Sequence, residues 1–210
     1  MLLLLLSPKA LLLGLAAALL LLAAPSLSAG TASCNDYEDT IYDPSAPLIY
    51  VDPAIHRTSS IPFRPKSGPG PLSTYLQLSL PYAPAAAILD QLRATPGVDS
   101  SITSRGEAHI TVITPPEFDS LLAPLNITAD DINRIALRHD IQSARFLPVC
   151  LGRVKGTVPA KHPTRVYELY SLIVDDIYDD LLRIRRDIYR LYRRRGGQGA
   201  LFRPEEFFPH

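Results

Sequence analysis

The segment His109-Ile110-Thr111-Val112 carries an imidazole and a hydroxyl two residues apart. In an extended strand alternate side chains share a face, so His109 and Thr111 are predicted to project together. Ile110, Val112 and Ile113 are then available for packing. An imidazole titrates near neutral pH, and a hydroxyl can hydrogen-bond an oxyanion. The pattern therefore predicts half of an acid–base site for a phosphate ester.

A second histidine, His210, follows the aromatic and proline residues of Glu206-Phe207-Phe208-Pro209. It comes after a long helical pattern and a glycine-rich turn, whereas His109 comes after a predicted strand and helix. We expect His109 and His210 to supply the two halves of one site.

Residues 1–28 are predicted to be a signal peptide. The segment is rich in leucine and alanine, Lys9 is its only charge, and Ser26 and Ser28 are small residues suited to signal-peptidase cleavage. We expect a secreted protein that is soluble after cleavage, with N-terminal anchoring in a membrane as the alternative. The chain has 21 basic and 21 acidic residues, so its net charge gives no reason to expect general attraction to nucleic acid.

Two further features depend on a secretory route. Cys34 and Cys150 can form one disulfide in an oxidising compartment; alternatively, Cys150 is simply buried and Cys34 is a free thiol. The triplet Asn126-Ile127-Thr128 is a glycosylation sequon, which predicts a glycoprotein only if the chain is secreted.

The rest of the chain divides into a proline-rich arm at 29–72 and a domain at 73–210. Alternating or apolar segments predict strands, and apolar residues at spacings of three and four predict helices. The predicted strands are 73–80, one carrying His109, 147–154, 166–174 and a last one near the end; the predicted helices are 85–94, 117–122, 128–138 and 176–194. This order predicts an α+β domain of two related lobes.

The pattern is clearest in the helix predicted at 176–194. Its apolar stripe comprises Ile177, Leu181, Ile184, Ile188 and Leu191. Aspartates gather at its start and arginines at its end, which matches the helix dipole. Thr128 is the predicted N-cap of the preceding helix.

The two motifs together resemble those of the 2H phosphoesterase superfamily, whose members carry one H-x-T-x motif in each of two lobes. The likeness covers roughly Leu72 to His210 and is closest to the branch likened to Swiss-Army-Knife RNA-repair proteins. It implies a pseudo-symmetric fold in which each lobe is an antiparallel sheet with helices on its outer side. Position by position, His109 and Thr111 match the first motif, and His210 matches the histidine of the second.

This resemblance implies hydrolysis of cyclic phosphodiesters or RNA-like 2′,3′-cyclic phosphates without a metal ion. One histidine would accept a proton and the other would donate one, while threonine hydroxyls would bind nonbridging oxygens. The second threonine would fall two positions after His210 and has no counterpart. We therefore expect a form truncated at the second motif, with impaired activity.

Other histidines and the arginines are given structural interpretations. His162-Pro163-Thr164 has the letters of the motif, but the proline and the surrounding residues 157–164 predict a loop. His139 is predicted to lie at a helix end, on the apolar side or capping carbonyls. Seven arginines lie between 183 and 195, and Arg183, Arg186, Arg190 and Arg194 are predicted to form a solvated helix face rather than a nucleic-acid surface.

The sequence contains no Gly-rich phosphate loop, serine nucleophile elbow or His/Cys metal cluster, so neither a metal nor another cofactor is expected. The leading hypothesis is a secreted phosphoesterase whose catalytic residues are His109, Thr111 and His210. The alternative is a secreted binding or interaction module that keeps the same fold without turnover. The sequence does not indicate the oligomeric state.

Overall fold

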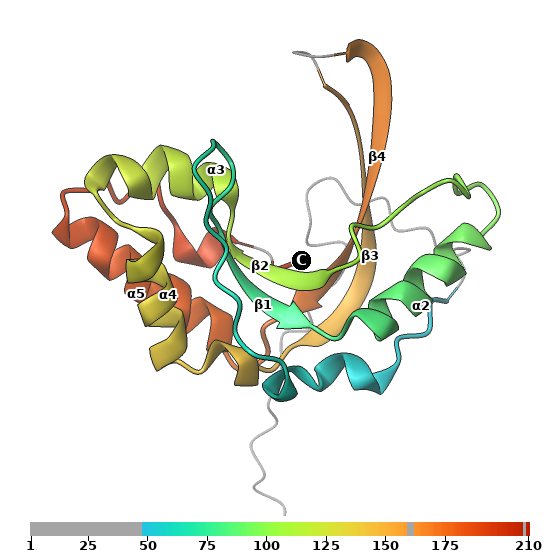
Figure 1. Ribbon diagram of the computed structural model, residues 1–210, viewed down its shortest axis with the longest axis horizontal. Helices are drawn as coiled ribbons and strands as arrows, with labels where there is room; N and C mark the ends of the chain where they lie inside the picture. The colour runs from blue at the N-terminus through green and yellow to red at the C-terminus, as the bar shows by residue number, and fades with distance from the viewer. Residues whose placement is uncertain (1–47, 159–161, 208) are drawn as a thin grey trace, which may run out of the picture. The chain divides into compact units, whose positions relative to one another are not determined.

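The strand that carries the histidine–threonine motif is β2, Ala108–Ile113, and it pairs antiparallel with β1, Leu76–Leu80 (Figure 1). The computed structural model describes residues 48–158, 162–207 and 209–210, and no side chains at 154–158 or 162–168. The predicted signal peptide, the first part of the arm and Cys34 lie outside the described residues.

Alternation along β2 is as predicted. Ile110 and Val112 are buried, whereas His109 and Thr111 are partly exposed. The register shifts where Leu76 pairs with Ile113 and the next residue of β1 pairs with Thr111. This bulge leaves Val112 without a partner on β1 and lets two successive residues face the core.

The prediction that β1 is half-buried is wrong. Gln77 and Ser79, the polar residues of the strand, are only 4% and 6% exposed. Gln142 covers the outer edge of β1, because its amide accepts a hydrogen bond from the Ser79 N–H at 3.0 Å and donates one to the Ser79 oxygen at 3.1 Å. Sequence periodicity could not reveal this cover, because it comes from a residue 63 positions away.

The second sheet is a long ribbon of β3, Leu147–Val158, and β4, His162–Asp175, paired antiparallel. Both strands extend beyond their predicted bounds, so the prediction of a loop at 157–164 is wrong. Pro163 is tolerated in β4 because it lies where the register is irregular, between the pairs Thr157–Val166 and Val158–His162.

The residues before the C-terminus connect the two sheets. The Thr111 N–H of β2 donates to the backbone oxygen of His210 at 3.0 Å, and the Val174 N–H of β4 donates to the oxygen of Pro209 at 3.1 Å. Adjacent residues that bond to opposite neighbours are typical of a strand lying between two others. The predicted last strand is thus represented by these two bonds rather than by a regular strand, and Figure 1 marks the C-terminus beside β2.

The first helices lie near their predicted positions. α2 spans Tyr82–Arg93 and begins earlier than expected, because Pro84 fits a first turn, where its missing N–H costs no hydrogen bond. The segment predicted as 117–122 begins with α3, Pro115–Glu117, and continues as a π-helical turn over Phe118–Leu122. α4, Ala129–Arg138, has the predicted N-cap Thr128.

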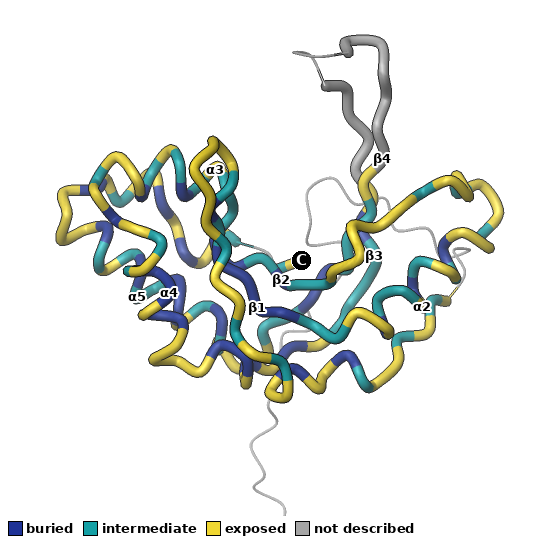
Figure 2. Tube along the Cα trace, in the orientation of Figure 1, coloured by how far each residue is buried: buried dark blue, intermediate teal, exposed yellow. Residues whose placement is uncertain are grey.

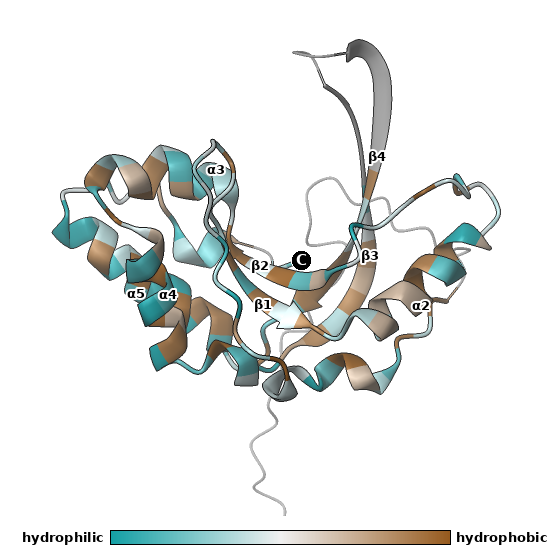
Figure 3. Cartoon of the chain, viewed as in Figure 1, coloured by the Kyte–Doolittle hydropathy of each residue, from teal (hydrophilic) through white to brown (hydrophobic). Residues whose placement is uncertain are grey.

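The last helix, α5, spans Asp180–Arg194 and packs against α4 and β2. In Figure 3 hydrophobic and hydrophilic residues alternate along it, as an amphipathic helix requires. The buried stripe includes Leu181, Ile184 and Ile188, but Ile177 precedes the helix and is 42% exposed, so that part of the prediction is wrong. Asp179 explains the later start, because its backbone is left-handed at φ 56° and cannot continue a helix. The Asp176 carboxylate accepts a hydrogen bond from the Leu182 N–H in the first turn at 2.8 Å.

The described part of the arm packs against the domain. Ile55, in the short 3-10 helix Pro53–His56, is 1% exposed and belongs to the hydrophobic core. Further along, Lys66 forms a backbone bridge with Tyr75. Figure 2 shows that the buried residues of this core run along β1 and recur along α4 and α5.

Two glycines provide a matched test of packing near the end of α5. A Cβ at Gly197 would overlap the ring of buried Tyr192, whereas a Cβ at Gly70 would have no atom within 4 Å. We expect Gly197→Ala to lower the free energy of unfolding by about 1–3 kcal/mol, since overpacking displaces a core ring. Gly70→Ala should leave it within about 0.5 kcal/mol of the parent. Urea denaturation measures both; equal effects would contradict the packing described.

Candidate active site

His109 lies on β2 with its side chain 21% exposed. Its ring packs against that of Tyr75, with the centroids 5.7 Å apart. Among the described residues, its Nδ1 atom is buried and has no hydrogen-bond partner. The imidazole is therefore positioned by packing against the Tyr75 ring, and its Nδ1 atom does not contact solvent.

A carboxylate that is itself paired with a lysine lies close to His109. Glu107 Oε1 lies 3.9 Å from His109 Nδ1, beyond hydrogen-bonding distance, while Glu107 Oε2 lies 2.8 Å from Lys66 Nζ. The Lys66 hydrogen bond lowers the pKa of Glu107, and the pKa of Lys66 is raised by the same bond. Both groups are therefore charged at neutral pH.

Burial lowers the pKa of His109 below its usual value of 6.5. The Glu107 carboxylate opposes this effect, whereas Lys66 and the His210 imidazole add to it. The imidazole of His109 is therefore neutral at pH 7, the form that accepts a proton.

Thr111 and His210 are brought together by the backbone bond that links β2 to the C-terminal segment. Thr111 lies on the same face of β2 as His109, two residues along the strand. The His210 ring also lies 6.1 Å from that of Phe207, centroid to centroid. The three residues predicted for the site thus lie in one region, where two sheet edges meet.

The side chain of Arg185, in α5, bonds to several chain segments around this region. Its guanidinium donates to the Val112 oxygen of β2 at 2.6 Å and, more weakly, to the Pro204 oxygen at 3.3 Å. It also bonds the Glu117 carboxylate at 2.8 Å and lies over the Phe207 ring, 4.1 Å from its centroid. The side chain is only 3% exposed, so this is a buried charge with several partners.

Glu117 serves both Arg185 and the start of α3. Thr114 and Glu117 form a capping box, in which each side chain bonds the other residue's backbone N–H. Burial raises the pKa of Glu117, but the hydrogen bonds and charge of Arg185 outweigh it, so the pKa lies below 4.5. The carboxylate is therefore ionised at neutral pH.

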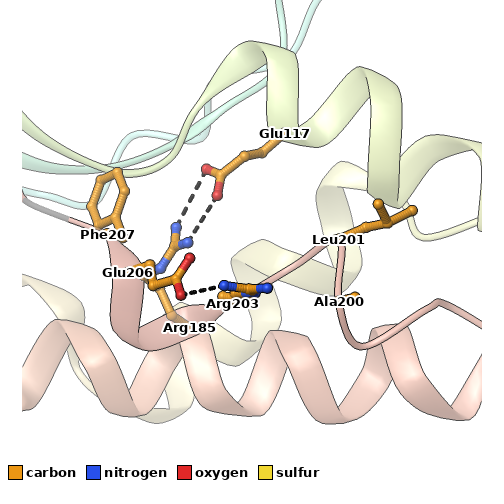
Figure 4. A pocket seen from close by; sticks show the side chains of 7 residues that line it. All are labelled: Glu117, Arg185, Ala200, Leu201, Arg203, Glu206 and Phe207. Carbon is orange, nitrogen blue, oxygen red and sulfur yellow. Dashed lines mark hydrogen bonds and ion pairs between the residues drawn. The ribbon is translucent and has the colours of Figure 1, made fainter.

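A cavity of about 270 Å³ lies beside this pair and is drawn in Figure 4. It is lined by Glu117, Arg185, Ala200, Leu201, Arg203, Glu206 and Phe207. A second cavity of about 190 Å³ lies near the start of α5. Neither of these two cavities is lined by His109, Thr111 or His210, the residues predicted to form one site. The charged groups drawn in Figure 4 already bond to one another across the first cavity.

The remaining polar residues have structural positions. His139 lies at the end of α4, as predicted, but it is exposed rather than on the apolar side, and its Nε2 lies 2.8 Å from the Asp187 carboxylate of α5. Arg183 and Arg190 are exposed and paired with aspartates of their own helix, consistent with a solvated face. Cys150 is disulfide-bonded. Within the described ranges, no three His, Cys, Asp or Glu side chains gather in a way that could hold a metal ion.

Three charged residues around the candidate site were not predicted from the sequence. Lys66 and Arg185 are both long cations whose partners are distant in sequence, and no periodic signal marks either one. Glu107 stands two residues before His109, a spacing that could have placed its carboxylate on the same face of the strand.

A family model described as "Swiss Army Knife, 2H phosphoesterase domain" matches residues 74–208. The chain belongs to this family. The 2H phosphoesterase fold accounts for the α+β architecture with two antiparallel sheets, which confirms the predicted fold class and the resemblance. Family membership indicates a phosphoesterase domain of a kind that acts on phosphodiester substrates.

No curated protein and no solved structure matches the chain. In the parts of this 2H phosphoesterase that the structure describes, no helix is long and apolar enough to cross a membrane.

Replacing Arg185 tests whether it holds the region together. Arg185→Met should lower the free energy of unfolding by about 3–5 kcal/mol, because it leaves the Glu117 charge and two carbonyl oxygens without their partner. Arg190→Met is the control, since Arg190 is 68% exposed and its ion pair lies at the surface. We expect that variant to lose less than about 1 kcal/mol. Denaturation with guanidinium chloride measures the free energy of unfolding of both variants. A loss for Arg185→Met as small as that for Arg190→Met would contradict the role given to Arg185.

Proposed function

We propose that the chain hydrolyses a cyclic phosphodiester, such as an RNA-like 2′,3′-cyclic phosphate, by histidine acid–base catalysis. The observation that carries this proposal is the Thr111–His210 backbone bond, which brings the backbone of His210 next to the strand that bears His109. Membership of the 2H phosphoesterase family supports the reaction class.

In this proposal His109 is the general base. Its neutral imidazole takes a proton from a water molecule, and the water oxygen forms a bond to phosphorus. The bond from phosphorus to one ribose oxygen breaks, and the His210 imidazolium donates a proton to that oxygen. The electron pair of the broken bond stays on the departing oxygen, so the products are a phosphate monoester and a ribose hydroxyl.

Thr111 stabilises the charge that develops in this step. Its hydroxyl lies on the face of β2 that carries His109 and can donate a hydrogen bond to a nonbridging phosphate oxygen. The step moves protons only from water to His109 and from His210 to the departing oxygen, so the proposal requires no metal ion or other cofactor.

Single substitutions test the catalytic roles. His109→Ala and His210→Ala should each lower kcat/KM for a 2′,3′-cyclic nucleotide about 10²–10⁴-fold, because each removes a proton-transfer group. Thr111→Val should lower kcat about 10–10³-fold, through the loss of one hydrogen bond to developing charge. His162→Ala removes the histidine of the similar H-P-T triplet and is the control, with activity unchanged. Tight binding of the nucleotide without any turnover by the parent chain would instead favour a binding module.

We also propose that the chain is secreted and glycosylated at Asn126. The asparagine is exposed in a turn after Ala123–Leu125, with a left-handed backbone at φ 55°, and so is accessible for modification. Secretion rests on the leader-like residues 1–28, with anchoring through that segment as the alternative.

Expression in a eukaryotic secretory host tests this proposal. The parent should reach the medium with an N-glycan, and Asn126→Gln should lose it, seen as a lower mass after electrophoresis that glycosidase treatment no longer changes. Asn133→Gln is the control, because Asn133 is buried and lies outside any sequon. Retention of the whole product inside the cell or on its membrane would contradict secretion.

A further inference from the structure

We propose that Lys66 and Glu107 form a positioning pair that fixes the orientation and the charge of the His109 imidazole. The inference rests on the proposed role of His109 as the base. Lys66 belongs to the arm and lies outside the matched family domain, which spans residues 74–208. If the pair acts in this way, the arm contributes a residue to the proposed active site.

The backbone holds Lys66 in place. The Tyr75 N–H donates to the Lys66 oxygen at 3.2 Å, so the arm runs beside the start of β1. The chain turns back tightly between Lys66 and Tyr75. A Cβ added at Gly68 would lie only 2.9 Å from the Cβ of Ser73, so glycine fits this close approach. The Lys66 ammonium is 6.0 Å from the centroid of the Tyr75 ring, the same ring that packs on His109. Arm, aromatic ring and imidazole thus form one contiguous set.

Glu107 connects Lys66 to the histidine. One carboxylate oxygen is 2.8 Å from Lys66 Nζ, and the other is 3.9 Å from His109 Nδ1. Both side chains are partly shielded, at 27% exposed for Lys66 and 36% for Glu107. Shielding strengthens the pair relative to one in open water.

The buried Nδ1 atom of His109 gives the pair its function. Among the described residues this nitrogen has no hydrogen-bond partner. The Glu107 carboxylate is a potential acceptor, because its Oε1 atom lies only 3.9 Å away. A small shift to about 3 Å would let Nδ1–H donate to this carboxylate. That tautomer leaves Nε2 with its lone pair, as a general base requires.

Lys66 limits how strongly the carboxylate acts on the ring. The groups that face His109 are Glu107, Arg105, Lys66, Tyr75 and the His210 imidazole. An unpaired carboxylate would favour the imidazolium, which cannot accept a proton. Because Lys66 holds one oxygen of Glu107 and adds a positive charge nearby, the pair orients the ring and keeps it neutral.

The test combines NMR titration of the His109 ring nitrogens with the pH dependence of kcat/KM for a 2′,3′-cyclic nucleotide. Lys66→Met frees Glu107 and removes a positive charge, so the pKa of His109 and the acidic limb of the rate profile should both rise by about half a pH unit or more. Glu107→Gln should move both in the opposite direction. Lys66→Arg should restore the parent profile.

Arg64→Met is the matched control, since Arg64 is an exposed cation on the same arm and the change again removes one positive charge. A shift in Lys66→Met no larger than in Arg64→Met would overturn the proposal. If the parent hydrolyses no cyclic nucleotide but the His109 titration moves as described, the proposed function fails and the positioning pair stands. If hydrolysis occurs and neither the titration nor the rate profile moves in Lys66→Met or Glu107→Gln, the pair fails and the function stands.

Discussion

The buried guanidinium of Arg185 connects the two parts of the chain that carry the candidate histidines. It bonds the end of β2 through the Val112 oxygen, the start of α3 through Glu117, and the C-terminal segment through Pro204 and the ring of Phe207. A buried charge is costly unless every donor finds a partner, so this arrangement tolerates little displacement. The positions of His109 and His210 therefore depend on a residue that touches neither imidazole in any contact described above.

The candidate site lies where the two sheets are connected. β1–β2 and β3–β4 are separate two-stranded sheets, and the bonds of Pro209 and His210 connect β4 to β2. His210, which is part of this connection, therefore lies directly beside β2, the strand that carries His109. The chemistry that we propose for this site rests on residue type, because imidazoles can move protons and a hydroxyl can stabilise developing charge.

Local patterns predicted the local structure well. Alternation identified β2 and its buried residues, and Thr128 with the acidic residues after it identified the start of α4. The apolar stripe identified α5, although Ile177 fell outside it, because the left-handed backbone of Asp179 interrupts helical geometry just before Asp180. These features depend on neighbours within a few residues, which a sequence displays directly.

Contacts between distant residues could not be predicted in this way. Arg185 is one of seven arginines in a short segment, and only the fold shows that it is buried while Arg183 and Arg190 are exposed. Lys66 and Glu107 are 41 residues apart, and Gln142 covers β1 from 63 residues away. For the candidate site, the sequence pointed to His109, Thr111 and His210, whereas the charged groups around them became visible only in three dimensions.

A crystal structure with a nucleoside 2′-phosphate bound tests the central claim most directly, because the ligand resembles a product of the proposed hydrolysis. The account predicts a phosphate within hydrogen-bonding distance of the imidazoles of His109 and His210 and of the Thr111 hydroxyl. A phosphate bound instead in the cavity beside Arg185 and Arg203, with His109 out of reach, would contradict it.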